Sequence, residues 1–305
     1  RCSIQLSYGS PLKRTSLFAQ QQANPIVREG AVCYPFAVIW LRVLLLLFLP
    51  LLTGCGTISY YAQAACGQAE FICKRRPIEV VLADPEQPET LKARLRLVNE
   101  LREFAATELD LKPGDSYIHY VKLDRPMALW VVNATPEFSL ELKSWWYPFV
   151  GRFEGRGFFV KHQAEHLAKE LRGQGYDVVT SGAPAYSTLG WFADPVLPSL
   201  LFHGHIALAN VILHELFHSS VFFGGQTAFN ESLANFVGHR GAIGFFEKEN
   251  GLSTPEARAA RASWSRELQL SGFFENARQQ LLFLYRSGGD PIFVMTKRKQ
   301  LFQDL

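Results

Sequence analysis

Charged residues are scarce in this sequence, and the two signs nearly cancel. Only 19% of the residues are Asp, Glu, Lys or Arg, and the formal net charge is +3. So small an excess does not favour binding to phosphates, and we expect no nucleic-acid partner. A phosphate-binding loop is also missing. Gly151-x-x-x-Gly155-x-Gly157 lacks the Lys-Ser/Thr of that motif and predicts a turn.

No apolar run before the folded part is long enough for a membrane span. Val43–Leu52 is ten residues long, whereas a transmembrane helix needs about 20. Arg42 before it and Thr53-Gly54 after it are typical of a secretory signal. The ending Leu-Leu-Thr-Gly-Cys55 resembles the lipobox of bacterial lipoproteins, which implies that Cys55 is lipidated and becomes the N-terminus. An ordinary cleaved signal or a short hydrophobic anchor is the alternative.

Methionine and cysteine are both rare. The two methionines are Met127 and Met295, so none precedes the signal, and the start of the leader is uncertain. Beyond the lipobox only Cys66 and Cys73 remain. They could pair in an oxidising compartment, but on one helix they would lie roughly 10 Å apart, too far for a disulfide. The sequence leaves this pairing open.

The clearest chemical motif is His214-Glu-Leu-Phe-His218. On a helix, this spacing places two imidazoles one turn apart on one face, as two corners of a tetrahedral zinc site require. Glu215 lies beside the first ligand, where its carboxylate can take a proton from a zinc-bound water. The motif predicts hydrolysis at one zinc ion, with Glu215 as general base and then acid.

A catalytic site of this kind needs a third protein ligand and an open fourth position. Gly224-Gly225 should end the first helix, and Thr227 is a suitable N-cap for a second. The second helix would return antiparallel to the first, so that Glu231 faces the two histidines. The alternative is a buried helix hairpin without metal, which is disfavoured because unpaired buried histidines and glutamates are costly.

His-Glu-Leu-Phe-His followed by Asn230-Glu231-x-x-x-Asn235 resembles the gluzincin metallopeptidases, the thermolysin-like group. The resemblance implies that Glu231 is the third zinc ligand and that Asn235, in place of the usual Asp, orients a zinc-bound histidine. An amide oxygen accepts the imidazole N–H but makes the ligand less basic. Gluzincins commonly stabilise the oxyanion with Tyr or His, which makes Tyr186 and His239 candidates.

A wider stretch, from about Thr53 to Leu305, resembles a bacterial family of predicted zinc aminopeptidase lipoproteins. The matching segments are Gly54–Gly56, Pro184–Gly190 and Phe229–Ser232. The resemblance implies a leader and signal over residues 1–54 and a metallopeptidase domain over 55–305, in a family whose chains usually continue further. Gly56 after the cysteine resembles the pattern sorted to the outer membrane, facing the periplasm.

The resemblance implies an aminopeptidase acting on a peptide or protein. Such an enzyme needs an acidic group for the substrate's α-ammonium, and the sequence offers Glu137 and Glu154 without selecting either. An endopeptidase for envelope proteins is the alternative within the same class. A non-catalytic zinc-binding lipoprotein is the alternative outside it, disfavoured by Glu215 and the open fourth position.

The remaining patterns predict an α+β fold with a small sheet packed on the zinc helix and a mostly helical C-terminal part. Period-two segments predict a hairpin of 116–123 with 127–133, of which 128–133 would be the edge strand that binds substrate backbone. Helical spacing, caps and breakers predict the helices. Further strands are predicted at 138–142, 157–160 and 176–180, and helices at 59–74, 89–109, 161–172, 254–286 and from 291 onward.

Overall fold

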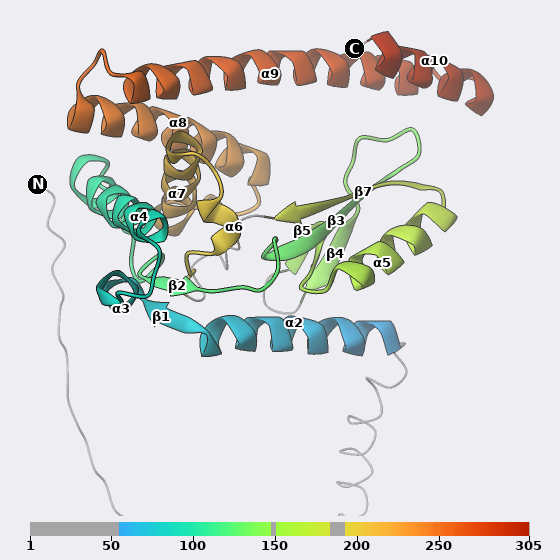
Figure 1. Cartoon of the computed structure of the whole chain (residues 1–305). Coiled ribbons are helices and arrows are strands. Elements are labelled where there is room, and N and C mark those ends of the chain that lie inside the picture. The colour runs from blue at the N-terminus through green and yellow to red at the C-terminus, as the bar shows by residue number, and fades with distance from the viewer. Residues whose placement is uncertain (1–54, 148–150, 184–192, 305) are drawn as a thin grey trace, which may run out of the picture. The chain divides into compact units, whose positions relative to one another are not determined.

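The structure is a computed structural model that describes residues 55–147, 151–183 and 193–304. The part that begins at Cys55 is α+β and mostly helical (Figure 1). None of the described helices combines the length and hydrophobicity that crossing a bilayer requires. The helices are α2 (Cys55–Cys73), α3 (Ile78–Ala83), α4 (Glu89–Glu108), α5 (Lys161–Gly173), α6 (Pro198–Leu201), α7 (His205–Ser220), α8 (Thr227–Asn250), α9 (Pro255–Arg286) and α10 (Pro291–Asp304).

The largest hydrophobic core lies among α4, α7 and α8. Apolar residues recur on α7 at spacings of three and four, and this face packs against both neighbours. Fully burying a Leu or Ile side chain contributes about 1.5–3 kcal/mol, so several such residues hold α7 firmly. The buried residues of α7 are Leu208, Ala209, Ile212, Leu213, Leu216 and Phe217, and those of α4 are Leu95, Val98, Leu101, Phe104 and Ala105.

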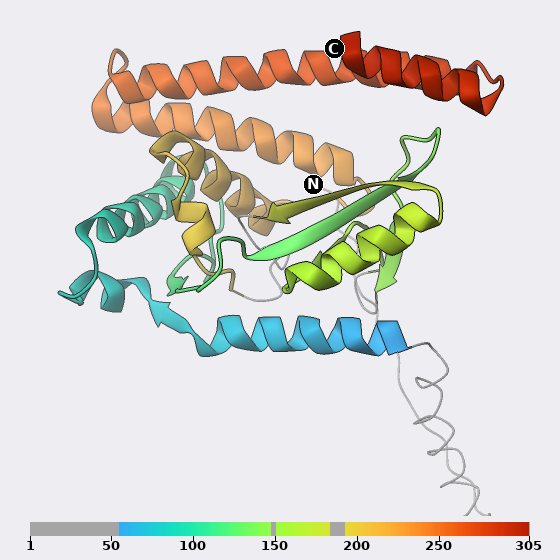
Figure 2. The ribbon, with the colours of Figure 1, turned by 45° about the vertical axis from the view of Figure 1, so that its right-hand side comes forward.

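The described strands form three small antiparallel groups. They are β1 (Arg75–Pro77) with β2 (His119–Val121), β3 (Leu129–Pro136) between β6 (Arg156–Phe158) and β7 (Tyr176–Ala183), and β4 (Ser144–Tyr147) with β5 (Gly151–Glu154). Helix α5 covers the three-stranded sheet with Ala164, Ala168 and Leu171, as Figures 1 and 2 show.

Three strand predictions are wrong. Segment 116–123 does not pair with 127–133, because β2 pairs instead with β1, and Val121 N–H donates to the carbonyl of Val196 at 3.0 Å. Segment 128–133 is not an edge, because β3 has Phe158 opposite Trp130 on one side and Gly182 on the other. Residues 138–142 form no strand.

The fold class is α+β as predicted, with a mostly helical C-terminal part, but the predicted packing of the sheet on the histidine helix is not found. Among the described elements, the sheet packs mainly on α5, whereas α7 packs on α4 and α8. The sheet approaches α7 at the end of β7, where Ala183 lines a pocket together with α7 residues. The strand that ends beside α7 is therefore β7, which is an edge strand of the three-stranded sheet.

The predicted long C-terminal helices are confirmed. Thr254 caps α9 by accepting a hydrogen bond from the backbone N–H of Ala257 at 3.4 Å, and Pro255 occupies the first helical position. Helix α9 runs alongside α8 and is followed by α10 (Figures 1 and 2). Through Ser263 and Trp264 in its N-terminal half, α9 contacts two residues of the site described next.

Candidate metal centre

Two imidazoles project from one side of α7. The ring centroids of His214 and His218 are 4.8 Å apart, and their Nε2 atoms are 3.1 Å apart. The buried apolar residues of α7 lie on the opposite side of the helix, so burial of that face turns both imidazoles toward α8. The two side chains are largely buried, with 18% and 7% of their surface exposed.

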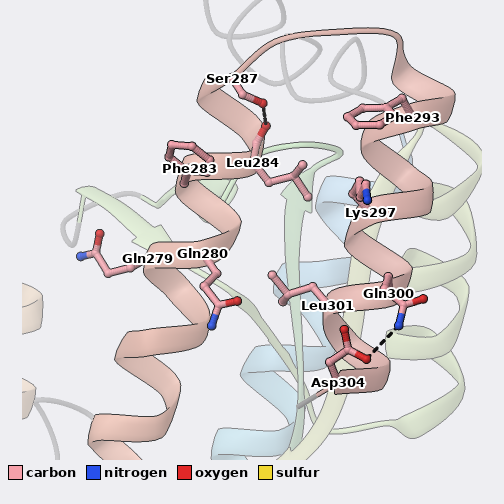
Figure 3. Close-up of a pocket in the computed structure, with 10 residues that line it drawn as sticks. All are labelled: Gln279, Gln280, Phe283, Leu284, Ser287, Phe293, Lys297, Gln300, Leu301 and Asp304. Carbon is pink, nitrogen blue, oxygen red and sulfur yellow. Dashed lines mark hydrogen bonds between the residues drawn. The ribbon is translucent and has the colours of Figure 1, made fainter.

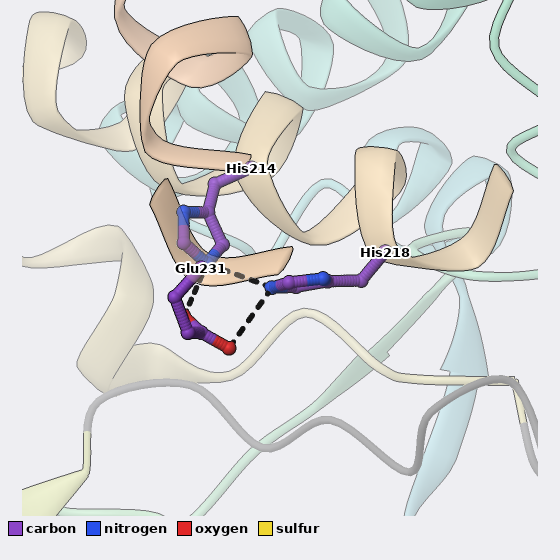
Figure 4. Close-up of side chains that lie close together, drawn as sticks. All are labelled: His214, His218 and Glu231. Carbon is purple, nitrogen blue, oxygen red and sulfur yellow. Dashed lines mark hydrogen bonds and ion pairs between the residues drawn. The ribbon is translucent and has the colours of Figure 1, made fainter. Parts of the chain in front are cut away.

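Glu231, on the first turns of α8, completes the cluster. Its Oε2 lies 3.4 Å from Nε2 of His214 and its Oε1 lies 3.3 Å from Nε2 of His218 (Figure 4). Within the described residues, these three form the one group of His, Cys, Asp or Glu side chains with ligand atoms within 4.8 Å of one another. The structure therefore brings together the three residues that the sequence predicts as metal ligands.

Asn230 fixes the turn that returns the chain from α7 to α8. Its Oδ1 accepts from the backbone N–H of Phe223 at 2.9 Å, and its Nδ2 donates to the Phe223 carbonyl at 2.8 Å. The predicted N-cap, Thr227, is instead the first residue of α8, and Gln226 before it makes no side-chain capping bond. The buried amide of Asn230, rather than a helix cap, therefore positions its neighbour Glu231.

Gly238 allows α8 to lie directly against the histidine helix. A Cβ at this position would lie 2.6 Å from the carbonyl oxygen of Asn210 and 3.2 Å from Cβ of His214. Contacts that short do not occur between a side chain and a fixed backbone, so glycine is needed at this crossing. The His-Glu-x-x-His motif alone did not indicate that position 238 must be glycine, because the need for glycine arises only where α7 and α8 touch.

Asn235 contacts His214 as the resemblance implies. Its Oδ1 lies 3.1 Å from Nδ1 of His214. An amide oxygen only accepts, so Nδ1 must carry the proton and Nε2 presents its lone pair toward Glu231 and His218. This hydrogen bond selects the tautomer that a metal ligand needs.

The charges within the cluster shift the pKa values of its members. The two imidazoles lower the pKa of the Glu231 carboxyl. Burial lowers the pKa of His214, but hydrogen bonding to Glu231 and the negative charges of Glu215 and Glu231 outweigh it, so the net shift is upward from 6.5. Without metal, the cluster therefore favours a proton on His214 beside an ionised Glu231.

Glu215 follows His214 on α7 and is partly buried. Burial raises the pKa of its carboxyl above 4.5, the two histidines oppose that shift, and Asp194 and Glu231 add to it. A carboxyl with a raised pKa exchanges protons more readily near neutral pH, as a general base and acid must. Sequence patterns carried no signal for Asp194, which is buried and comes from the segment before α6.

Tyr117 is a second neighbour of Glu215 that sequence reasoning missed. It is 1% exposed, has a positive φ of 62°, and donates its backbone N–H to the Asp194 carbonyl at 2.6 Å. Burial, then the charges of Glu215 and Asp194, raise the pKa of its hydroxyl well above 10. Its hydroxyl has no hydrogen-bond partner among the described residues. A left-handed backbone at a bulky residue is uncommon and frequently marks a functional region.

A pocket of about 470 Å³ opens beside His214 and Glu215. It is lined by Ala183, Ala207, Asn210, Val211, His214, Glu215, Asn235 and His239. The predicted candidate His239 is therefore in the site, with its ring 5.2 Å from that of Trp264 on α9. Burial and the nearby His214 lower its pKa, so it is a neutral hydrogen-bonding group at neutral pH. The other candidate, Tyr186, lies outside the described residues.

Helix α9 brings a carboxylate into the neighbourhood of His239. Asn210 Nδ2 donates to Ser263 Oγ at 3.4 Å, and Trp264 packs on His239, so this face of α9 adjoins the pocket. Glu267 lies one turn beyond Trp264 on that face, and its charge acts on His239. The candidates from the sequence, Glu137 and Glu154, are not among the residues that line the pocket, and neither is Glu267, which is placed near it by its effect on His239. Nothing in the sequence pointed to Glu267.

A larger pocket of about 730 Å³ lies between α9 and α10 (Figure 3). Phenylalanine, leucine and glutamine dominate its walls, and its one carboxylate, Asp304, accepts a hydrogen bond from Gln300 at 2.8 Å. It contains no histidine or cysteine among the described residues that line it, so its greater size does not make it the better candidate for chemistry.

The lipidation candidate, Cys55, is the first residue of α2, and its modification stays a prediction. Cys66 and Cys73 lie on the same helix as two free, exposed thiols. Of the two possibilities that the sequence left open, paired or free, the structure has the free thiols.

Comparison with known proteins gives one match. A search of curated proteins and a search of solved structures found no similar protein. One family model, described as "Putative aminopeptidase", matches residues 59–305 and so covers α2 after its first turn and every later element, including both helices of the metal cluster. The chain therefore belongs to this aminopeptidase family.

Proposed function

We propose that this chain is a zinc-dependent aminopeptidase, with His214, His218 and Glu231 as the ligands of one zinc ion. The observation that carries the proposal is the spacing of the donor atoms. Tetrahedral zinc with bonds of 2.0–2.1 Å places its ligand atoms about 3.3 Å apart. The two Nε2 atoms are 3.1 Å apart, and each lies 3.3–3.4 Å from one of the two carboxylate oxygens of Glu231. With one ligand atom taken from each residue, all three atoms lie within 4.8 Å of one another.

The kinds of donor also suit the ion. Two neutral imidazole nitrogens and one carboxylate form a ligand set used by catalytic zinc. Asn235 holds His214 in the required tautomer, and Glu231, which is 53% exposed, lies on the solvent side of the two histidines. A bound zinc ion would acidify water and polarise a peptide carbonyl in the neighbouring pocket.

Each surrounding residue then has a role that follows from its position. Glu215 takes a proton from the attacking water and returns it to the leaving amine, for which its raised pKa suits it. His239, neutral at the pocket wall, donates a hydrogen bond to the oxygen on which negative charge develops. Glu267 holds the substrate's α-ammonium, which an aminopeptidase must recognise.

The leader supports a place for the enzyme at the cell envelope. Leu-Leu-Thr-Gly-Cys55 is the reason to propose a lipidated N-terminus, with the protein on the outer membrane and facing the periplasm. We expect Cys55→Ser to prevent lipidation, and mass spectrometry of the native N-terminal peptide measures this directly. An unmodified Cys55 would contradict the anchor without bearing on the peptidase.

A comparison of two glutamates tests the catalytic proposal. Glu215→Gln removes the proton acceptor but no ligand, so zinc content should stay near one ion per chain while kcat falls about 10²–10⁴-fold. Glu231→Ala removes a ligand, so zinc affinity itself should fall, and added zinc should restore activity in part. Glu249→Gln, an exposed glutamate farther along α8, is the matched control.

Elemental analysis and kcat are measured on each folded variant, with aminoacyl anilides and with N-blocked, internally quenched peptides as substrates. Cleavage of the N-blocked peptides alone would identify an endopeptidase instead. Zinc and activity that both survive Glu231→Ala would rule out the proposed ligand set.

A further inference from the structure

The outward face of α2 is uncharged along its whole length. Glu70 is the single charged residue of this helix, and it is not among the exposed ones. The large apolar side chains of the face recur at helical spacing, with exposures of 45% for Ile58, 39% for Tyr61 and 47% for Ile72. The exposed residues are Gly56, Thr57, Ile58, Ser59, Tyr61, Ala62, Ala65, Cys66, Ala69, Ile72 and Cys73.

The inward face of α2 is firmly held. Gln63 accepts a hydrogen bond at its Oε1 from the backbone N–H of Phe159 at 2.9 Å, and Phe71 is fully buried. Gly67 lies directly against the Phe159 ring, which leaves no space there for a Cβ. Glu70 is neutralised by Arg125 at 2.7 Å and Lys74 at 3.0 Å. The inner side of α2 is thus packed against the rest of the fold, and Gln63 and Glu70 have polar partners there. No described element covers the outer side.

The position of α2 in the chain indicates what covers that side. In the sequence, Thr53 and Gly54 alone separate the apolar run Val43–Leu52 from Cys55, which is the first residue of α2. If Cys55 carries acyl chains, as the proposed function has it, this point of the chain lies at a lipid surface. Since the helix rises 1.5 Å per residue, Ile58 and Tyr61 lie within about two turns of that point.

We propose that the outer face of α2 lies flat on the lipid surface, as an interfacial helix that supplements the anchor at Cys55. The inference rests on the membrane anchorage in the proposed function, but not on the peptidase activity. The face carries no basic residues, so its affinity comes from burying apolar side chains and Tyr61 in the interface rather than from anionic lipids. With few large apolar residues, it is a weak binder that acts beside an anchor.

The consequence is a defined orientation of the enzyme on the membrane. Figures 1 and 2 both show α2 along one side of the unit and α9 along the opposite side, with α7 between them. Contact through α2 would hold the cluster on α7 and α8 at a fixed height above the lipid and leave α9 facing away from it.

The native thiols of the face make the proposal testable. Cys66 and Cys73 are exposed on the outer side of α2, so contact with lipid should shield them. The full chain, in envelope fragments open to both sides, is treated with a membrane-impermeant maleimide, and labelling is followed peptide by peptide by mass spectrometry. Each rate is normalised to that of the unfolded chain. Ser253→Cys, in the exposed loop before α9, serves as an unshielded reference.

We expect Cys66 and Cys73 to react at least about tenfold more slowly than the thiol of Ser253→Cys. The double substitution Ala65→Glu/Ala69→Glu places two charges on the face, so it should restore fast labelling while the anchor keeps the protein in the membrane fraction. The matched control is Ala259→Glu/Ala262→Glu, the same change on the exposed side of α9, which should leave the shielding intact.

Three results would overturn the proposal. The first is equal labelling of all thiols in the membrane-bound wild type. The second is slow labelling that accompanies disulfide-linked or cross-linked dimers through Cys66 or Cys73, because a second copy would then cover the face. The third is recovery of the wild type in the non-membrane fraction. None of these readouts depends on catalysis, so failure of the peptidase proposal would be recognised separately.

Discussion

At the scale of single residues, the cluster combines two opposite requirements on His214. Without metal, a proton on its ring is favoured by the carboxylate of Glu231. As a ligand, the same ring must be neutral, because the metal takes the lone pair of Nε2. The pH dependence of the metal-free protein should therefore differ in direction from that of the metal-bound protein.

In excess chelator, the contact between His214 and Glu231 should stabilise the fold most between about pH 4.5 and 6.5. The pKa of Glu231 is lowered, so its contribution is present above 4.5 and is lost as the pH falls through the lowered value. The pKa of His214 is raised, so its contribution is complete below 6.5 and is lost as the pH rises through the raised value. The measurement is the difference in Tm between wild type and Glu231→Gln across pH.

That difference should shrink toward alkaline pH in chelator. With zinc added it should instead grow toward neutral pH, where the imidazoles are free to bind metal. A difference in Tm that stays constant up to alkaline pH in chelator would show that the two side chains do not form an ion pair.

Glu267 is the residue expected to distinguish substrates by their N-terminus. Replacing it with Gln removes one charge-assisted hydrogen bond, about 1.5–3 kcal/mol, and should raise KM for aminoacyl substrates about tenfold or more. Cleavage of N-blocked peptides, if any, should not change, because these carry no ammonium. Glu256→Gln, an exposed glutamate on the first turn of the same helix, is the control. An unchanged KM in Glu267→Gln would place ammonium recognition elsewhere.

At the scale of elements, the site depends on how closely α8 approaches α7. Gly238→Ala would insert a Cβ 2.6 Å from the backbone oxygen of Asn210, so the helices must separate. We expect a loss of about 1–3 kcal/mol in the free energy of unfolding, as for other overpacked contacts. Zinc affinity should fall too, because separation moves Glu231 away from the two histidines.

Gly272→Ala is the matched control for that change. Gly272 lies in the exposed interior of α9, and a Cβ added there would have nothing within 4 Å, so alanine should add up to about 1 kcal/mol of stability. Urea unfolding and zinc titration on both variants measure the effects. Equal behaviour of the two variants would show that the crossing of α7 and α8 tolerates a methyl group.

At the scale of the whole molecule, the hydrophobic core and the metal cluster occupy opposite sides of α7. The core among α4, α7 and α8 is complete without the cluster, whose carboxylate reaches solvent. Chelation should therefore lower Tm without unfolding the protein at room temperature. Zinc at a free concentration of 100 times its Kd should add about 2.7 kcal/mol to the free energy of unfolding.

Circular dichroism and thermal scans with and without chelator measure this effect. Loss of helical signal on chelation at room temperature would mean that folding itself depends on the metal. A Tm that does not respond to zinc would mean that the cluster does not bind it.

Local sequence was sufficient for the long helices and for the three residues of the candidate metal cluster. The spacing of apolar residues and the caps predicted α4, α9 and α10, because helix formation depends on residues three and four positions apart. The placement of His214, His218 and Glu231 followed from the same periodicity and from a short return turn. Nothing in these predictions required knowledge of distant parts of the chain.

Only the tertiary structure decided how the strands pair and what surrounds Glu215. Strand β3 is central because it pairs with β6 and β7, segments that come later in the chain, so a period-two pattern could not distinguish it from an edge. Tyr117, Asp194 and Glu267 approach the site from three separate segments. Strand pairing and contacts between elements depend on groups that lie far apart in the sequence. The spacing of neighbouring residues therefore cannot predict which of these groups come together in the fold.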